Sequence, residues 1–583
     1  MMEEKNVLLS VKDLEVKFNV RGRVLTAIRG ISLDILENES IAIVGESGSG
    51  KSVFTKTFAG MLDGNGFISQ GDVIFNDAEL VDTVVNMNAA AWKQVEGIAA
   101  KLDQYSAYEH GAETYNALTA LEEEKTARAS LTAEENQKLD DEISELVFQR
   151  TEAFNLKQTY DPHNEKDKIK ATSSQITAFD AQIKKLQQSK DAVIAQRKKT
   201  AAADTAYLQE YSAKKAELKQ RYEEEIQKPV SEEVRSRNEV LAYEVYLSVG
   251  RYGKIKRDKC IGLLLKELRK AMVQGKDLSN DSVLNAVFDA VTFRVKYLDK
   301  TDVRLHGTCV INLAKVKDTN DWTQIRGKKI ATVFQDPMTS LNPIITIGKQ
   351  ITSIILKHQQ CSEVEARTRA LELMYKVGIP NAEKRFDDYP FQYSGGMRQR
   401  IVIAIALSCQ PKILICDEPT TALDVTIQAQ ILKLLKDLQK EFNYTIVFIT
   451  HDLGVVANVA DRVAVMYAGQ IVELGKVEEV FFDPRHPYTW ALLSSLPQLA
   501  QKNTVLYSIT GTPPSLYNKI IGDPFAPRNP YCMKIDTLVD PPMFQVTETH
   551  FAKTWLLDPR APKVEKPEMI HNIHEKLIEA FNI

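Results

Sequence analysis

The sequence predicts an α/β fold in which a mainly parallel sheet is covered by helices, with a large helical insertion and a C-terminal appendage. Two observations predict it. The first 82 residues carry short strand patterns joined by turns, and strand and helix patterns alternate from about residue 307. Between them, the composition shifts to alanine, lysine, glutamate and glutamine. The 583 residues therefore divide into 1–82 and 307–480 as two parts of one domain, 83–306 as the insertion and 481–583 as the appendage.

Composition limits the class of protein and its location. Hydrophobic residues make up 44% of the chain and charged residues 26%, and the formal net charge of −4 gives no basic field for a nucleic-acid partner. The six cysteines are scattered, so we expect reduced thiols. No apolar run approaches the roughly 18 residues of a membrane span, and the first residues lack the regions of a secretory signal. We expect the protein in the cytosol, or at the cytosolic face of a membrane where other chains hold it.

The first motif is a glycine-rich loop between the apolar run 40–44 and a helix that we expect to begin near Lys51. It matches the P-loop pattern in full, with the residues Gly45, Glu46, Ser47, Gly48, Ser49, Gly50, Lys51 and Ser52. The glycines let backbone N–H groups turn onto phosphate oxygens, and the helix N-terminus adds its positive end. Lys51 is expected to reach the β- and γ-phosphates, and the Ser52 hydroxyl to ligate Mg²⁺.

The insertion carries helical patterns but no chemistry that we can identify. A capping box at Thr132 and Glu135 begins one amphipathic arm, a breaker at 160–164 ends it, and a second arm carries apolar residues three and four apart over 176–193. We expect an antiparallel helical hairpin, followed by a more globular helical piece around 240–290. A disordered charged linker is the alternative.

The α/β pattern resumes near Gly307. The rejoining point is ambiguous, because 71–77 and 307–313 could each be the same hairpin strand. Further along, Ser362 and Glu365 predict the capped start of a helix.

Apolar runs in the second part end in residues suited to phosphate chemistry. The run 412–416 ends at Asp417 and Glu418, at the edge where an open α/β sheet places its ligand. We expect Asp417 to hold Mg²⁺ and Glu418 to polarise an attacking water. Gln335 and His451 each follow another expected strand. Gln335 could touch the metal or the water through its amide, and His451 could donate to the γ-phosphate or orient the water.

Taken in order, these motifs resemble those of the nucleotide-binding subunits of ABC transporters. The set comprises the P-loop, the Gln335 loop, S-G-G-M-R-Q-R, I-L-I-C-D-E-P, T-A-L-D and I-T-H-D. The finer wording, with V-G-E-S-G-S-G-K-S-V, F-Q-D-P-M-T-S-L-N-P and the C-terminal D-P-F-A-P-R, is similar to the D-type ATPase of oligopeptide or dipeptide permeases. The resemblance covers 1–82 and about 307–565. It implies an ABC-type P-loop NTPase with a helical signature subdomain.

The resemblance also implies roles for single residues. The signature turn, Ser394, Gly395 and Gly396, binds the γ-phosphate held by the P-loop of a partner subunit. Asp424 lies in the loop that links the two sites. Lys51, Gln335, Glu418 and His451 form the catalytic set, in which Gln335 senses the docked permease helix and His451 is the switch residue. Phe18 is the candidate for stacking on adenine.

The chain departs from the family pattern in two places. Where related C-terminal regions often carry cysteines, which in some members ligate an iron–sulfur cluster, this chain has Asp523 and Asn529, and only Cys532 remains nearby. We therefore expect no iron–sulfur cluster. The second departure is the helical insertion, for which we expect a docking surface.

The function implied by the resemblance is the ATP-hydrolysing subunit of an importer for oligopeptides or dipeptides, using ATP and Mg²⁺. The implied partners are a second ATPase of the F type, two transmembrane permease subunits and an extracytoplasmic peptide-binding protein. The alternative is a soluble ABC ATPase of DNA repair or chromosome organisation, because such proteins also split their cassette with helical hairpins. In those proteins, however, the coiled coil separates the Gln loop from the signature turn, whereas 335–418 is continuous here.

Overall fold

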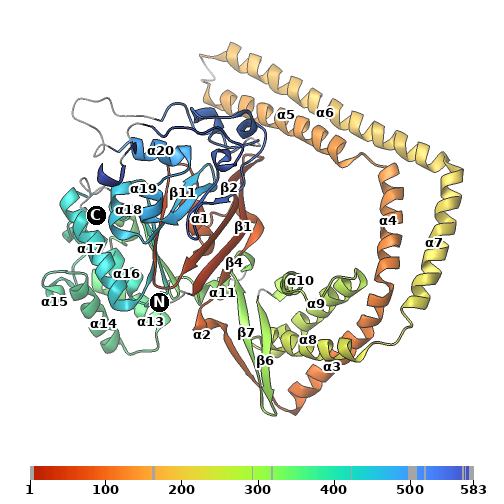
Figure 1. The fold of residues 1–583 in the computed structure, drawn as a ribbon, viewed down its shortest axis with the longest axis horizontal. Coiled ribbons are helices and arrows are strands. Elements are labelled where there is room, and N and C mark those ends of the chain that lie inside the picture. The colour runs from red at the N-terminus through yellow and green to blue at the C-terminus, as the bar shows by residue number, and fades with distance from the viewer. Residues whose placement is uncertain are drawn as a thin grey trace. The chain divides into compact units, whose positions relative to one another are not determined.

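The chain forms two compact units (Figure 1). The computed structural model describes residues 6–160, 164–291, 293–316, 319–421, 423–496, 509–517, 520–567, 570–571 and 573–576. One unit, here called the sheet unit, comprises Met1–Phe18, Leu25–Asp77 and Asn312–Ile583. The other, the helical unit, comprises Asn19–Val24 and Ala78–Ile311. The limits of the helical unit lie close to the expected insertion at 83–306, whose assignment as an insertion stays a prediction.

The main sheet of the sheet unit has eight strands in the order β13-β14-β12-β11-β3-β10-β9-β8. Their bounds are β3 Ser40–Val44, β8 Ile330–Val333, β9 Ile413–Asp417, β10 Thr445–Thr450, β11 Arg462–Tyr467, β12 Gln470–Lys476, β13 Phe544–Gln545 and β14 Phe551–Ala552. The five strands from β11 to β8 in this order are parallel, and the other three pair antiparallel at one edge. β3 and β10 are buried along their whole length, as their apolar sequences require. The carboxyl ends of the parallel strands therefore share one edge of the sheet.

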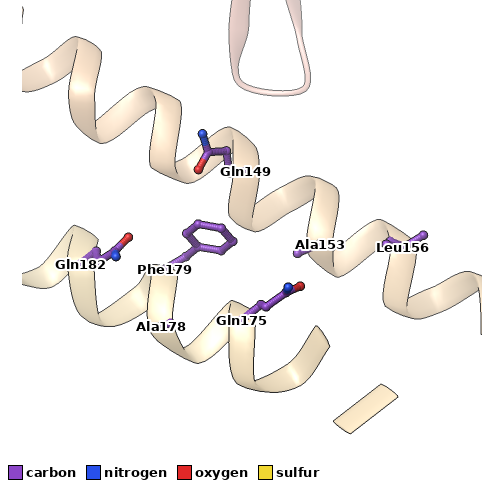
Figure 2. A pocket seen from close by; sticks show the side chains of 7 residues that line it. All are labelled: Gln149, Ala153, Leu156, Gln175, Ala178, Phe179 and Gln182. Atoms are coloured by element: carbon purple, nitrogen blue, oxygen red, sulfur yellow. The ribbon is translucent and has the colours of Figure 1, made fainter. Parts of the chain in front are cut away.

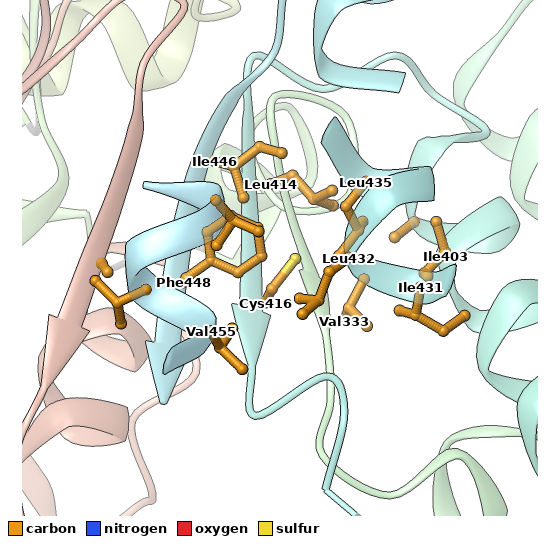
Figure 3. Close-up of a cluster of buried hydrophobic side chains, with 14 of the residues drawn as sticks. Val333, Ile403, Leu414, Cys416, Ile431, Leu432, Leu435, Ile446, Phe448 and Val455 are labelled. Atoms are coloured by element: carbon orange, nitrogen blue, oxygen red, sulfur yellow. The ribbon is translucent and has the colours of Figure 1, made fainter. Parts of the chain in front are cut away.

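The sheet unit also contains helices, several of which supply side chains to its hydrophobic core. They are α1 Lys51–Phe58, α11 Thr319–Thr323, α12 Pro337–Ser340, α13 Ile347–His358, α14 Glu363–Lys376, α15 Ala382–Arg385, α16 Gly395–Leu407, α17 Val425–Phe442 and α18 Leu453–Val459. Apolar side chains of α16 and α17 meet those of β9 and β10 in one buried cluster (Figure 3). The capping box expected at Ser362 and Glu365 is present and begins α14.

A second, antiparallel sheet in the sheet unit joins β1 Val7–Val20, β2 Arg23–Leu36 and β4 Gly66–Phe75 in the order β2-β1-β4. β4 pairs with β1, so the residues near 71–77 supply this hairpin strand. The chain returns to the sheet unit at Asn312, whose side-chain amide donates to Asp72 Oδ1 at 2.7 Å and accepts from the Val73 N–H at 3.0 Å. The return point is therefore bonded directly to β4.

The helical unit has helices along the region for which the sequence left a charged linker open. They are α2 Ala78–Val81, α3 Ala89–Ser106, α4 Ala112–Arg128, α5 Ala133–Thr159, α6 Lys166–Ala203, α7 Thr205–Glu225, α8 Glu232–Val249, α9 Lys254–Val273 and α10 Asp281–Phe288. Three strands, β5 Asp82–Asn86, β6 Arg294–Thr301 and β7 Arg304–Asn312, pair in the order β5-β7-β6. α3, α8 and α9 pack together as the more globular piece.

The helical arms are longer than one simple hairpin. One arm consists of α4 and α5 and the other of α6 and α7. α5 packs along α6 and α4 packs along α7 (Figure 1). The expected capping box at Thr132 and Glu135 begins α5, whereas residues 161–163 of the expected breaker lie outside the described residues. The contact between α5 and α6 leaves a pocket without titratable groups (Figure 2). It is lined by Gln149, Ala153, Leu156, Gln175, Ala178, Phe179 and Gln182. Such a lining offers no acid, base or nucleophile.

The C-terminal region of the sheet unit is mostly irregular. Its helices are α19 Val477–Phe482 and α20 Pro487–Ser494, and short 3₁₀ turns follow, among them Ala526–Arg528. Within the parts of the chain described above, no helix is long and apolar enough to cross a membrane.

Candidate functional site

The P-loop lies between β3 and α1, as the sequence predicts. Gly45, Gly48 and Gly50 have φ values of 153°, 81° and 101°, a region that favours glycine. A Cβ atom at Gly45 would lie 2.2 Å from the backbone oxygen of Met466. The loop therefore needs glycine both for its turn and for its close approach to β11.

Lys51 is enclosed by the loop that precedes it. Its ammonium donates to the backbone oxygens of Gly45 at 2.7 Å and Glu46 at 3.0 Å, and the residue is 7% exposed. Burial lowers the pKa of Lys51 below its usual value, and the carboxylates of Glu418, Asp417 and Glu46 oppose that shift. The loop thus orients the Lys51 ammonium, and the nearby carboxylates favour its charged form.

Asp417 ends β9 and reaches the first turn of α1. Its Oδ1 accepts a hydrogen bond from the Ser52 hydroxyl at 3.1 Å. Burial raises the pKa of Asp417; the Ser52 hydrogen bond opposes this shift and the adjacent Glu418 carboxylate adds to it. Two of the three residues expected at Mg²⁺, Ser52 and Asp417, are therefore in contact, although 365 positions separate them in the chain.

Glu418 gathers side chains from three segments. Its Oε2 accepts from the Gln335 amide at 2.8 Å and from the Thr421 hydroxyl at 2.9 Å. Its Oε1 lies 3.1 Å from His451 Nδ1. Burial raises the pKa of Glu418, but the hydrogen bonds with His451 and Thr421 outweigh it, so the pKa lies below its usual value. The carboxylate is therefore in the ionised form that can accept a proton from water.

The backbone of Glu418 is itself unusual. Its φ of 45° is left-handed, which is rare for a residue with a side chain. Such strain is typical of functional sites. The Glu418 N–H donates to Ile449 O of β10 at 2.9 Å, which fixes the residue at the sheet edge.

The signature turn begins α16. Ser394 is its N-cap, with the hydroxyl accepting from the Met397 N–H at 3.4 Å, and Gly395 and Gly396 form its first turn. A Cβ atom at Gly396 would lie 2.8 Å from Ile427 Cγ2, so α17 approaches closely there. Ser394 and Gly395 are exposed, and a helix N-terminus of this kind suits an anion.

Asp424 caps a helix and Phe18 is buried, and the role of Asp424 in the loop that links the two sites stays a prediction. Asp424 is exposed and caps α17, with Oδ1 accepting from the Ile427 N–H at 2.9 Å; Ala422 of the same motif lies outside the described residues. Phe18 is 8% exposed, and its ring fills the space above Gly66 of β4. The role of Phe18 in stacking on adenine stays a prediction.

The donors near Asp417 fit a magnesium ion. Asp417 Oδ1 and the Ser52 hydroxyl are hard oxygen ligands in contact, and Mg²⁺ at phosphate sites takes one or two carboxylates together with phosphates and waters. Among the residues that the structure describes, no group of three or more His, Cys, Asp and Glu could hold a metal ion. The site therefore suits a metal that arrives with a phosphate ligand.

Three residues at the site are not among those predicted from the sequence. Thr421 could have been found, because it lies three positions after Glu418 in the same turn. Tyr488 and Arg528 could not, because both contact Glu46 from more than four hundred positions away.

Comparisons with known proteins agree with this geometry. A model of the ABC transporter family matches residues 28–250 and 296–421, more than half of the chain. A model described as the oligopeptide/dipeptide transporter C-terminal region matches residues 472–535.

Individual relatives are similar to a little more than half of this chain. The oligopeptide transport ATP-binding protein AmiE of Streptococcus pneumoniae is 59% identical over 319 residues, covering 55% of this chain and 89% of that protein. The oligopeptide transport ATP-binding protein OppD of Bacillus subtilis is 51% identical over 331 residues, covering 56% and 91%. The dipeptide transport ATP-binding protein DppD of Lactococcus lactis is 51% identical over 319 residues, covering 54% and 90%.

Proposed function

This chain belongs to the ABC transporter family as an ATP-binding protein of oligopeptide and dipeptide transport, and from that membership we propose how its residues share the work of ATP hydrolysis. The chain is the ATP-binding subunit of an oligopeptide/dipeptide importer and an ATPase. This assignment replaces the alternative of a DNA-repair ATPase.

Glu418 is the residue that polarises the attacking water. The observation that carries this proposal is the convergence of Gln335, Thr421 and His451 on its ionised carboxylate. Lys51 and the P-loop N–H groups hold the phosphates, and fixed positive charge there stabilises the transferred phosphoryl group. His451, with its side chain 64% exposed, can turn from Glu418 toward a phosphate.

Asp417, Ser52 and the amide oxygen of Gln335 are the proposed ligands of Mg²⁺. The contact between Asp417 and Ser52 supports this set, since it brings both oxygens to one point beside the P-loop. When bound there, Mg²⁺ supplies positive charge to the phosphate oxygens. We propose no iron–sulfur cluster, because Cys532 is the one thiol near Asp523 and Asn529.

The signature turn serves the nucleotide of a second subunit. The exposed Ser394 and Gly395 at the N-terminus of the 13-residue helix α16 support this proposal, whereas the P-loop residues and Glu418 belong to the chain's own site. The proposed second subunit is a similar ATPase of the F type. Two transmembrane permease subunits and a peptide-binding protein complete the complex, which holds this chain at the cytoplasmic face of the cell membrane.

The test is Glu418→Gln in the assembled transporter. The amide keeps the size of the side chain but removes the base, so we expect ATP binding to persist and hydrolysis to fall by about a hundredfold or more. Glu478→Gln, the same change at an exposed position in α19, serves as the control. Turnover at the wild-type rate in Glu418→Gln would remove Glu418 from this role.

A further inference from the structure

Glu46, the second residue of the P-loop, is held by two residues of the C-terminal region. Arg528 binds its carboxylate with both terminal nitrogens, Nη1 to Oε2 at 2.6 Å and Nη2 to Oε1 at 3.0 Å. The Tyr488 hydroxyl accepts from the Glu46 N–H at 2.8 Å. Since Lys51 donates to the Glu46 backbone oxygen, Glu46 links the C-terminal region to the catalytic lysine.

Arg528 is fixed in this position by its own surroundings. Its side chain is 4% exposed; Nε donates to the Thr510 backbone oxygen at 3.0 Å and Nη1 also donates to the Tyr467 hydroxyl at 3.1 Å. Tyr467, Tyr488 and Phe525 pack as one aromatic cluster, with ring centroids 4.6 to 5.3 Å apart. A planar guanidinium bound at all three nitrogens and enclosed in this way has a single orientation.

Charge explains why the loop needs this partner. Glu46 places a carboxylate in the loop that receives the phosphates, and like charges so close together oppose binding. The charge of the Glu46 carboxylate acts inside the loop, since Glu46 is one of the groups that raise the pKa of Lys51. The guanidinium of Arg528 is permanently charged and cancels it.

We propose that Arg528 is a positioning residue of the nucleotide site: from the C-terminal region it neutralises Glu46 and holds the P-loop in the geometry that receives the phosphates. This inference rests on the proposed function of the P-loop. It assigns a task in nucleotide binding to the region that matches the oligopeptide/dipeptide transporter C-terminal model.

The test measures ATP affinity and steady-state ATP hydrolysis in the full-length chain assembled in its transporter. Arg528→Gln leaves Glu46 uncompensated, so we expect the KM for ATP to rise about tenfold with a smaller change in kcat, because the uncompensated carboxylate opposes binding of the phosphates themselves. Arg528→Lys keeps the charge but not the two-point geometry and is expected to lie between Arg528→Gln and the wild type.

Glu46→Gln separates electrostatics from folding. It removes the charge that Arg528 neutralises, so alone it is expected to raise the KM for ATP much less than Arg528→Gln does. Combined with Arg528→Gln, it is expected to remove most of the loss caused by Arg528→Gln. The matched control is Arg462→Gln, which breaks the ion pair with Glu39 at the opposite end of β3 (Nη1 to Oε1 3.1 Å) and is expected to lower stability without changing the KM for ATP.

Three results would overturn the proposal. The first is a wild-type KM for ATP in Arg528→Gln. The second is an equal rise in KM on replacing Arg528 whether residue 46 is Glu or Gln. The third is a rise in KM in Arg462→Gln as large as that in Arg528→Gln. If Arg528→Gln does not fold, Arg528→Lys and Glu46→Gln test the proposal instead. A tenfold loss of ATP affinity in Glu46→Gln would contradict the charge argument. Failure of the wild-type chain to bind ATP would instead count against the proposed function, so the two failures are distinguishable.

Discussion

Asp523 is a buried carboxyl group whose ionisation should weaken the fold. One oxygen, Oδ1, accepts from the Phe525 N–H at 2.9 Å, whereas Oδ2 is buried with no hydrogen-bond partner among the described residues. Burial, reinforced by Asp536 and Asp540 and opposed by the Phe525 hydrogen bond, raises the pKa of Asp523 from 3.8 to about 7. The Asp523 carboxyl therefore takes up a proton on folding between about pH 4 and about pH 7.

The sign and size of the effect follow from linkage. A carboxyl whose pKa is raised in the folded state stabilises the protein below its unfolded pKa, and this stabilisation is lost as the pH rises through the folded pKa. With the two values 3.8 and about 7, the free energy of unfolding should fall by about 2.5 kcal/mol between about pH 5 and about pH 8 through this group. Asp523→Asn keeps the Oδ1 acceptor and removes the charge, so it should remove this dependence.

The assay is urea-induced unfolding of the wild type and Asp523→Asn, followed by circular dichroism across that pH range. The stability of Asp523→Asn relative to the wild type should increase with pH. Asp483→Asn is the control: burial raises the pKa of Asp483, but ion pairs with Lys566 and Arg485 outweigh it, so its titration lies below this range. Parallel pH profiles for the wild type and Asp523→Asn would refute the reasoning.

Two further predictions concern the helical unit and the signature turn. Replacing residues 90–300 by a short linker should leave ATP binding intact, because Asn312 is bonded directly to β4 where the chain re-enters the sheet unit; loss of nucleotide binding in a folded product would show that the insertion is part of the core. Gly396→Ala should be less stable than Gly395→Ala by about 1 kcal/mol or more, because its Cβ would meet Ile427 Cγ2 at 2.8 Å while that of Gly395 meets only Leu423 Cδ2 at 3.9 Å. Thermal unfolding of the two variants checks this, and equal midpoints would contradict it.

The parts of the site that the sequence predicts are those governed by local rules. Asp417 ends a parallel strand, Gln335 and His451 each follow one, and the carboxyl ends of such strands share one edge. The capping boxes at Thr132 and Ser362 are equally local, since each depends on a residue three positions ahead.

The parts that the sequence does not predict depend on long-range packing. Arg528 contacts Glu46 across 482 positions, and nothing in either segment specifies that distance. The division of each helical arm into two helices also escapes prediction, because α4 and α7 are polar helices with few buried residues to reveal their pairing. The burial of Phe18 depends on Gly66, a residue of another strand.

The two oxygens of the Glu418 carboxylate contact different loops: Oε2 accepts a hydrogen bond from Gln335, and Oε1 lies beside the His451 ring. One side chain thus contacts two loops, the Gln335 loop, which the resemblance implies to face the permease, and the loop after β10. Because the two oxygens belong to a rigid planar group, a turn that suits one loop also moves the oxygen bonded to the other. The two loops are therefore coupled through Glu418, so that a shift of either loop alters the contact of the other with this carboxylate.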